Sequence, residues 1–217
     1  MKSRREALGI LSRFIFTVTG ILGAVAASTR SLYAAVKKRI LPKETDPGML
    51  SDENPEYLDT RNLKITPMES FGTMGDVDQT IDRHQWRLEV GGGGNKRLQL
   101  SYDDVLNLPA IHKKVLLICP GFFSYHAEWT GISIQELLRR SGVPAGSVQK
   151  VHIRGQSKRG EKSEVFSIAE VNSDAIFLAY AVNGKTLPQK HGFPLRVVAD
   201  GHWGAEWIKY VTGLEFA

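Results

Sequence analysis

Beyond residue 62 the chain consists of short apolar segments separated by turn-forming residues. Apolar and polar side chains alternate in Trp86–Val90, which predicts a strand with one buried face. Arg97–Leu100 continues the same pattern after a run of glycines at 91–94. The two segments therefore predict a β-hairpin. The glycines lack the G-x-G-x-x-G spacing of a phosphate-binding loop, and no helical pattern follows them directly, so we interpret them as the turn of this hairpin.

Other segments are rich in β-branched and aromatic residues, a composition that favours strands. They are Val115–Cys119, Val148–Arg154, Glu164–Ile168, Ala175–Val182 and Leu195–Ala199. Asn183-Gly184, a strong signal for a tight turn, directly follows the fourth of these segments. The body of the chain is therefore expected to contain many short strands.

Short helices are predicted where a serine stands three residues before an acidic residue, which is the pattern of a capping box. The pattern occurs at Ser101–Asp104, Ser133–Glu136 and Ser167–Glu170. The second of these helices is expected to end at Gly142 and Pro144. Scattered strands and short helices, without regular β-α-β alternation, predict an α+β fold with mixed sheets.

The N-terminus has the features of an export signal. Arg4-Arg5 precedes the apolar run Phe14–Ala27, and Ala24-Val25-Ala26 offers a small-x-small cleavage site. We predict that residues 1–35 are a twin-arginine-type signal or, alternatively, an uncleaved N-terminal anchor that allows membrane association. Either interpretation places the body of the chain in the periplasm or elsewhere outside the cytoplasm.

Residues 36–62 are rich in Pro, Asp, Glu and Asn and show little periodicity, which predicts a linker and surface wrap. The compact domain is expected to cover residues 63–217. At 217 residues with 42% hydrophobic residues, the chain is long enough to bury one substantial core.

The net charge of +5 does not describe the folded body. Residues 1–43 hold nine of the 28 Lys and Arg and one of the 23 acidic residues, so the rest of the chain holds 19 basic and 22 acidic residues. Nucleic-acid binding depends chiefly on the neutralisation of phosphates by a basic folded surface. We therefore expect no nucleic-acid partner.

The chain has one cysteine, Cys119, which excludes an internal disulfide, multi-cysteine zinc and iron–sulfur sites, and thiol-attached haem. Cys119 ends an apolar strand and stands where the chain breaks into a loop at Pro120-Gly121. A lone cysteine is often a small buried apolar residue. In an oxidising compartment a free thiol is a liability, whereas a soft thiolate suits a soft transition metal. Both interpretations stay open on these residues alone.

Several separate motifs occur along residues 63–217. They are the strand that ends at Cys119, Trp129–Leu138, Asn183–Pro188, His191-Gly-Phe-Pro-Leu-Arg196, Gly201-His-Trp-Gly204 and Trp207-Ile-Lys209. Together, and in this order, they resemble the sulfite-oxidase family of molybdopterin-binding domains. The resemblance implies a sulfite-oxidase-like fold for residues 63–217 and a molybdenum-molybdopterin cofactor (Mo-MPT).

The resemblance also implies roles for individual residues. The sulfur of Cys119 is expected to ligate molybdenum, which makes Cys119 both the catalytic residue and the metal ligand. A pterin with its phosphate needs charge-assisted donors, and basic side chains supply them. Trp207 and Ile208 are expected to contribute backbone groups. The implied cofactor-binding residues are Cys119, His191, Arg196, Trp207, Ile208 and Lys209, with Gly155 or its neighbour Arg154 as a weaker candidate.

Departures from the family pattern bear on the substrate. Sulfite oxidases carry an Arg-Asn-His stretch near the start of the domain, where this chain has Phe71 followed by Gly72–Asp76. They also carry Asn-Arg soon after the metal cysteine, where Phe122 and Phe123 stand here. These losses of donors argue against sulfite. The resemblance is nearer to small bacterial periplasmic members such as the methionine-sulfoxide reductase catalytic subunit, although the Glu two residues after its cysteine is Gly121 here.

We therefore expect an exported molybdopterin-dependent oxidoreductase that performs oxygen-atom transfer with two-electron chemistry on a small substrate, sulfoxide-like rather than sulfite. Tyr125, His126 and His202 are candidates for proton movement near the metal. A separate electron-transfer partner, either a membrane haem protein or a cytochrome, is expected. The alternative is a non-catalytic exported domain of the same fold that binds a partner or an anionic ligand.

Overall fold

The computed structural model describes residues 37–93 and 97–217. The expected signal or anchor at 1–35 lies outside the described residues, and so do residues 94–96 of the glycine-rich turn. Lys38–Ala217 forms one compact unit. No helix in the described part of the chain is both long enough and apolar enough to cross a membrane.

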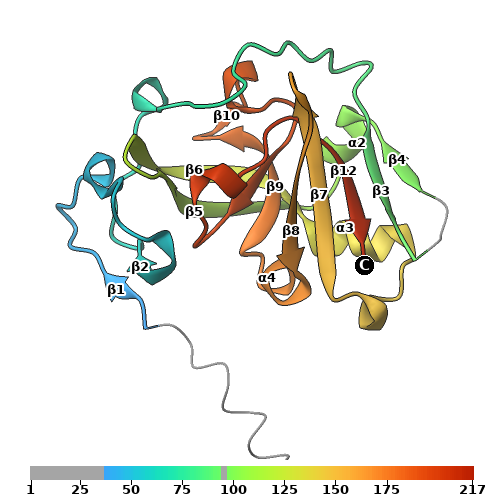
Figure 1. The fold of residues 1–217 in the computed structure, drawn as a ribbon, viewed down its shortest axis with the longest axis horizontal. Coiled ribbons are helices and arrows are strands. Elements are labelled where there is room, and N and C mark those ends of the chain that lie inside the picture. Colours follow the sequence, from blue (N-terminus) through green and yellow to red (C-terminus); the bar gives the residue numbers. More distant parts are fainter. Residues whose placement is uncertain (1–36, 94–96) are drawn as a thin grey trace, which may run out of the picture. The chain divides into compact units, whose positions relative to one another are not determined.

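The first sheet is built on a long hairpin that carries the cysteine (Figure 1). Strand β5 (Ala110–Cys119) pairs antiparallel with β6 (Phe123–Ser133) along its whole length. Strand β6 pairs in turn with β9 (Ile176–Val182). The other edge of β9 takes both β10 (Lys185–Thr186) and β11 (Arg196–Ala199), again antiparallel. The sheet therefore brings Cys119 and the segment after residue 185 into one layer.

The second sheet has the strand order β4-β3-β12-β7-β8. Its strands are β3 (Leu88–Gly92), β4 (Leu98–Leu100), β7 (Lys150–Ser157), β8 (Gly160–Ser167) and β12 (Val211–Phe216). Strand β12 lies parallel to β3 and antiparallel to β7, and β3 with β4 forms the hairpin that the alternation predicts. The α+β fold with mixed sheets is thereby confirmed.

Three short α-helices connect the strands: α2 (Tyr102–Leu106), α3 (Ile134–Ser141) and α4 (Ile168–Asn172). Helices α2 and α4 begin with the predicted capping boxes. The box predicted at the start of α3 is wrong. There Ser133 accepts a hydrogen bond from the backbone of Gln135, while the Glu136 carboxylate pairs with two arginines, whose hydrogen bonds lower its pKa to about 2. Helix α3 ends, as predicted, at Gly142 with φ of 73°.

Turns and 3₁₀ segments complete the connections. The predicted tight turn between β9 and β10 is present, with positive φ at Asn183 (49°) and Gly184 (73°). The 3₁₀ segments are η2 (Pro47–Leu50), η3 (Pro55–Tyr57), η4 (Met68–Ser70), η5 (Ala145–Ser147), η6 (Gln189–His191) and η7 (Gly204–Glu206).

The second half of strand β5, residues 115–118, is buried on both faces because its alternate side chains contribute to different apolar clusters. Val115 and Leu117 belong to the main core, which joins residues of both five-stranded sheets. Leu116 and Ile118 belong to a second cluster, whose other buried members are leucines from the N-terminal wrap: Leu41, Leu50, Leu58 and Leu63. The near-continuous apolar run before Cys119 follows from this double burial.

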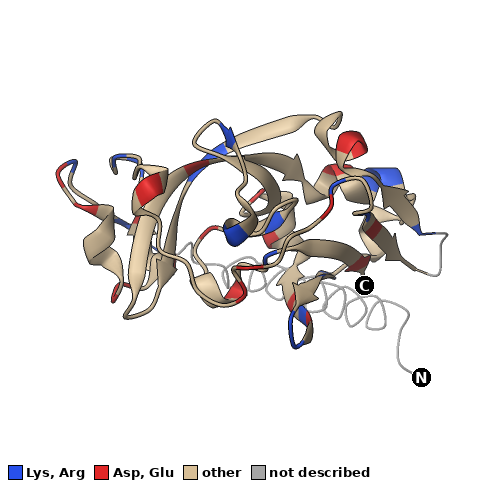
Figure 2. Ribbon diagram, turned by 90° about the horizontal axis from the view of Figure 1, so that it is seen from above, with Lys and Arg blue, Asp and Glu red and all other residues tan. Residues whose placement is uncertain are grey.

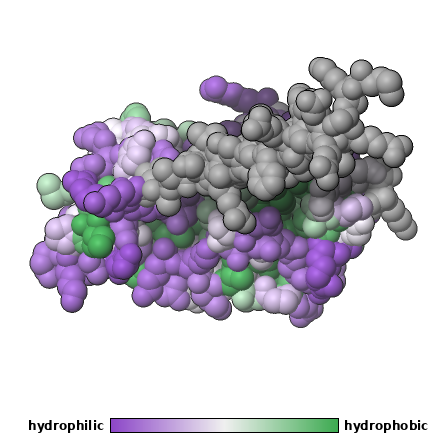
Figure 3. All heavy atoms as spheres, turned by 90° about the horizontal axis from the view of Figure 1, so that it is seen from below, coloured by the Kyte–Doolittle hydropathy of each residue, from purple (hydrophilic) through white to green (hydrophobic). Residues whose placement is uncertain are grey.

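The wrap packs on the β5–β6 hairpin. Its two short strands, β1 (Arg39–Ile40) and β2 (Leu58–Asp59), pair in parallel. The hydroxyl of Ser124 at the start of β6 donates to the carbonyl oxygen of Pro47 in η2 at 2.6 Å. Residues 38–62 therefore share a compact unit with the rest of the described chain. On the face in Figure 3, hydrophobic residues form separate small patches among polar ones.

Candidate functional site

A cavity of about 590 Å³ lies where the end of β5 meets segments from both sheets. Its lining includes the loop Gly72–Asp76, the start of β6, the tip of the β7–β8 hairpin, and side chains from η6 and β11. The segment 204–210, between η7 and β12, completes the lining. No other part of the described chain gathers so many of the residues singled out from the sequence: Cys119, His191, Arg196, Trp207 and Lys209 all line this cavity.

Cys119 stands at the end of β5, before the turn that leads into β6. The turn is closed by a hydrogen bond from the Phe122 backbone to the Cys119 carbonyl, and Gly121 has φ of 72°. The Cys119 sulfur lies 3.8 Å from the thioether sulfur of Met74. Burial raises the pKa of the Cys119 thiol. The thiol is therefore protonated at neutral pH, and coordination to a metal is what would deprotonate it.

Arg196 carries a buried positive charge beside the cavity, with 2% of the residue exposed. Its guanidinium donates to the carbonyl oxygens of His191 and Val197, at 3.1 and 3.4 Å, and lies 5.1 and 5.4 Å from the ring centroids of Trp129 and Trp207. No carboxylate pairs with it among the described residues. Burial lowers the pKa of Arg196. A buried cation without a counter-charge is costly, so the site suits an anionic ligand.

His191 is buried, with 1% of the residue exposed, and its Nε2 atom has no hydrogen-bond partner in the part of the chain that the structure describes. Burial, together with the charge of Arg196, lowers the pKa of His191 to about 4. The imidazole is therefore neutral at physiological pH. A neutral, unsatisfied ring nitrogen beside a cavity is available to a bound group.

Lys209 fastens the loop Gly72–Asp76 across the cavity. Its ammonium lies 2.9 Å from Thr73 Oγ1 and 3.0 and 3.3 Å from the carbonyl oxygens of Met74 and Asp76. A fourth oxygen, the carbonyl of Lys190 in η6, lies at 2.9 Å. Burial, together with the charge of Arg196, lowers the pKa of Lys209 to about 8.

Comparison with known families identifies the domain. A model of the oxidoreductase molybdopterin binding domain matches residues 74–217. The chain belongs to this family. It is accordingly an oxidoreductase whose cofactor is Mo-MPT.

Curated relatives share the family but differ in length. The protein-methionine-sulfoxide reductase catalytic subunit MsrP of Xanthomonas axonopodis pv. citri is 25% identical, over 99% of this chain and 70% of its own. The mitochondrial sulfite oxidase of Homo sapiens is 28% identical, over 73% of this chain and 34% of that protein. The crystal structure of the sulfane dehydrogenase SoxCD from Paracoccus pantotrophus matches with a TM-score of 0.58 and 19% identity, over 86% of this chain and 54% of that one. This family member thus spans about a third of that sulfite oxidase and about half of that SoxCD chain.

The cavity fits the family's cofactor. A thiol suits a soft metal, and the orphaned Nε2 of His191 and the uncompensated charge of Arg196 suit a polar, anionic organic group. Among the described residues, no cluster of three or more His, Cys, Asp or Glu could hold a metal ion by itself. The metal would therefore reach this family member as part of the cofactor.

Two of the residues implied by the resemblance lie behind the cavity instead of lining it. Ile208 is fully buried, and its carbonyl accepts a hydrogen bond from the Val197 backbone. Gly155 in β7 packs against the segment after Ile208, where a Cβ would lie 2.4 Å from the Lys209 carbonyl oxygen. Arg154, the alternative to Gly155, pairs with two glutamates, Glu89 and Glu161, outside this lining.

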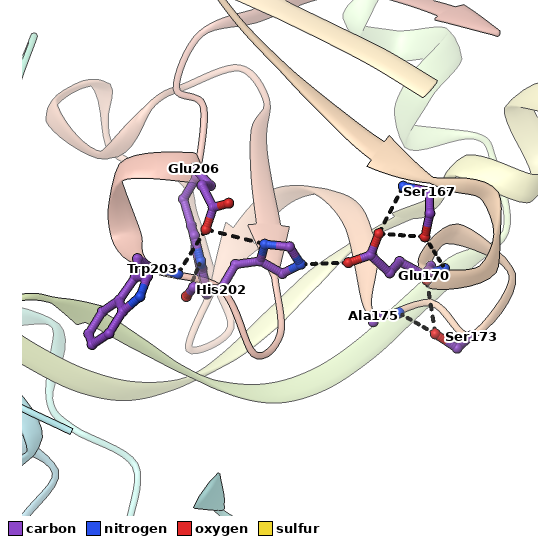
Figure 4. A network of polar contacts seen from close by, with 8 residues as sticks. Ser167, Glu170, Ser173, Ala175, His202, Trp203 and Glu206 are labelled. Atoms are coloured by element: carbon purple, nitrogen blue, oxygen red, sulfur yellow. Dashed lines mark hydrogen bonds and ion pairs between the residues drawn. The ribbon is translucent and has the colours of Figure 1, made fainter. Parts of the chain in front are cut away.

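Of the three candidates for proton movement, the structure brings only Tyr125 to the cavity. Burial raises the pKa of its hydroxyl, which a hydrogen bond with Arg196 opposes. His126 points to the N-terminal wrap, with Nδ1 3.3 Å from the Lys64 carbonyl oxygen. His202 lies between two carboxylates, with Nε2 2.7 Å from Glu170 and Nδ1 3.2 Å from Glu206 (Figure 4).

Sequence reasoning missed the residues that line the cavity on its outer side. Arg159 and Lys162 at the tip of the β7–β8 hairpin line it, as do Thr73, Met74 and Asp76. The only sequence signal at the hairpin is the run Ser157-Lys-Arg-Gly-Glu-Lys162, which is typical of any solvated turn. Its role becomes visible only when the second sheet places the hairpin beside Cys119.

Proposed function

We propose that this family member is an exported enzyme that performs oxygen-atom transfer on a sulfoxide-like small substrate. The observation that carries the proposal is the thioether of Met74, 3.8 Å from the Cys119 sulfur. Met74 belongs to the loop Gly72–Asp76, which stands where the resemblance to sulfite oxidases leads us to expect Arg-Asn-His. A soft, neutral group thus occupies a position where a sulfite enzyme needs charged donors.

The side chains after Cys119 support the same choice of substrate. Phe123 and Tyr125 stack at a centroid distance of 6.0 Å, and Tyr125 stacks on Phe71 at 4.0 Å. Phe123 and Tyr125 line the cavity. An aromatic wall with a thioether beside it stabilises an apolar organic group around a polar S–O bond more readily than a hydrated dianion.

When bound, Mo-MPT supplies the two-electron oxygen-atom chemistry. We propose that Cys119 holds the metal through its sulfur and that His191 and Arg196 hold the pterin with a ring nitrogen and a guanidinium. Reduction of a sulfoxide consumes two electrons and two protons and yields a sulfide and water. Tyr125, whose hydroxyl is bonded to Arg196, is placed to hold or move one of these protons at the cavity.

The remaining residues implied by the resemblance act on the shape of the site. Trp207 lines the cavity and stacks on the Arg196 guanidinium, while Ile208 and Gly155 form the packed layer behind it. Lys209 holds the loop that carries Met74.

The proposed setting is extracytoplasmic. The leader features at 1–35 support export by the twin-arginine route, which carries proteins already folded around a cofactor. The electrons would come from a separate haem partner, either a membrane protein or a cytochrome, as the resemblance to the smaller bacterial members of the family implies.

A substrate screen on the Mo-MPT-loaded protein tests the proposal. Turnover is measured with alkyl sulfoxides, N-oxides and sulfite, with a reduced viologen dye as electron donor or ferricyanide as acceptor. The expected result is that sulfoxides give the highest kcat/KM and that sulfite gives none above the Cys119→Ser background. Turnover of sulfite above that of sulfoxides would refute the proposed substrate class.

The non-catalytic alternative gives a different outcome in the same experiment. Its motivation is the loss of the Arg-Asn-His donors. A folded protein that binds no molybdenum from a host that makes Mo-MPT, and that turns over none of the substrates, would favour a partner-binding or anion-binding module.

A further inference from the structure

The tip of the β7–β8 hairpin supplies basic side chains that the family motifs do not include. Arg159 and Lys162 line the cavity together with Arg196, Lys209 and one carboxylate, Asp76. Elsewhere on the described chain, basic and acidic residues are interspersed (Figure 2). The excess of positive charge around this one cavity therefore indicates an anionic ligand.

The two basic residues of the family motifs already have partners. The Arg196 guanidinium bonds to carbonyl oxygens and to Tyr125, and it lies over the rings of two tryptophans. The Lys209 ammonium, with three N–H donors, lies within hydrogen-bond distance of four oxygens, three of which belong to the loop Gly72–Asp76. Lys209 can therefore meet a phosphate only by releasing this loop.

Arg159 and Lys162 differ from the other basic residues of the hairpin. The Arg159 side chain makes no ion pair or hydrogen bond within the described ranges, and the Lys162 ammonium donates only to the Ala205 carbonyl oxygen. Lys158, between the cavity-lining residues Ser157 and Arg159, pairs instead with Asp78 and does not line the cavity. The hairpin side chains that keep N–H donors unpaired among the described residues, those of Arg159 and Lys162, are thus the ones that line the cavity.

The hairpin tip is held in position against the loop. Asp76 Oδ2 accepts a hydrogen bond from the Lys158 backbone at 2.9 Å, and Gln79 donates to the Gln156 carbonyl oxygen at 3.4 Å. Hydrogen bonds from Ser157 and Lys158 lower the pKa of Asp76. Its carboxylate is therefore engaged by the hairpin and leaves the charges of Arg159 and Lys162 uncompensated.

We propose that Arg159 and Lys162 form the binding site for the phosphate of Mo-MPT, and that Lys209 positions the loop Gly72–Asp76 instead of binding the phosphate. A phosphate monoester carries nearly two negative charges, which a guanidinium fork and an ammonium match. The proposal rests on the family's cofactor and is independent of the proposed substrate.

Pterin retention tests this assignment without any measurement of turnover. The full chain and its Arg159→Gln/Lys162→Gln variant are produced in a host that makes Mo-MPT and are dialysed at increasing salt. Released pterin is oxidised and measured by fluorescence, and molybdenum by mass spectrometry. We expect the double variant to retain at least about tenfold less pterin at low salt, with a shallower further loss as salt rises, because the two charge-assisted contacts that salt would screen are removed.

Lys158→Gln is the matched control for Arg159→Gln, since each removes one positive charge from the same turn but Lys158 lies outside the cavity lining. Lys158→Gln is expected to retain pterin like the wild type. Lys209→Met is expected to retain more pterin than the double variant. Arg159→Lys should retain more pterin than Arg159→Gln. This comparison keeps the test decisive if circular dichroism shows that the double variant is misfolded. Pterin retention at the wild-type level in a folded Arg159→Gln/Lys162→Gln protein, or a larger loss in Lys209→Met, would overturn the assignment.

Discussion

The two sides of the cavity are built by different kinds of interaction. The buried side consists of Cys119, Tyr125, His191, Arg196 and Trp207, all but the first almost fully enclosed in the sheet and its following loops. The loop side consists of residues 72–76 and 157–162, which are half-buried or exposed and are joined to each other by hydrogen bonds.

This difference distinguishes the side of the cavity that we expect to hold the cofactor from the side that we expect to serve as its access route. Packing holds the buried side, so its geometry exists before any ligand arrives. The loop side depends on a few polar contacts, chiefly those of Lys209, and on the close approach of Gly72 to Phe123, where a Cβ would lie 2.2 Å from the ring. Local opening is expected where such contacts are few and solvent-exposed. We therefore expect the loop side to be the part that admits the cofactor and selects the substrate.

The largest effect is expected from Cys119→Ser on the buried side. A hard hydroxyl does not replace a soft thiolate, so molybdenum should fall from about one atom per chain to background. Pterin should fall less, because its other contacts are retained. Mass spectrometry for molybdenum and fluorescence for pterin measure the two separately, and unchanged molybdenum would show that the metal is not held by this sulfur.

Arg196→Leu should separate cofactor binding from folding. The variant is expected to lose pterin at least about a hundredfold, because a fork of charged donors is removed. The unloaded protein should lose less than about 2 kcal/mol of unfolding free energy, because the buried guanidinium has no carboxylate partner among the described residues. Denaturant unfolding of the unloaded protein checks the second value. A loss above about 4 kcal/mol there would assign Arg196 to structure instead.

The buried side could be predicted from the sequence further than the loop side. Strand alternation and the motif around His191 and Arg196 are local signals, and they indicated residues that do meet at one cavity. Strand β6 was missed, although Phe123, Tyr125, Ala127 and Trp129 alternate toward the main core, because Tyr125 was assigned to proton movement and Trp129 to a family motif.

The loop side could not be predicted because its contacts join segments far apart in the chain. Lys209 meets Thr73 across 136 positions, and the Lys158 backbone meets Asp76 across 82. No periodicity or capping pattern encodes such contacts. The box predicted at Ser133 failed for a different, local reason, since the Glu136 carboxylate pairs with arginines one turn later in α3.

Lys209→Met should loosen the loop side and leave the buried side intact. The loop that carries Met74 loses its hydrogen bonds, so Cys119 in the unloaded protein should react with iodoacetamide about tenfold faster, with a loss of roughly 1–3 kcal/mol in unfolding free energy. Lys113→Met is the matched control, because Lys113 also donates to two backbone carbonyls but does not line the cavity. Equal alkylation rates in wild type and Lys209→Met would show that the loop does not cover the thiol.

The smallest effect concerns His202, which ties η7 of the cavity lining to α4 (Figure 4). Burial lowers the pKa of His202, but the hydrogen bonds that its ring donates to the carboxylates of Glu206 and Glu170 outweigh burial and raise the pKa above its usual value. A raised pKa in the folded state gives stability that is present below about pH 6.5 and is lost as pH rises through the folded pKa. The wild type should therefore lose more unfolding free energy than His202→Gln between pH 6 and pH 8.5, as denaturant unfolding of the two proteins at both pH values would measure. Taking the difference between the two proteins cancels Lys209, whose pKa of about 8 lies in the same window. A pH-independent difference would mean that the pKa of His202 is the same in the folded and unfolded states, so that its carboxylate partners do not stabilise its charged form and packing holds η7 beside the cavity.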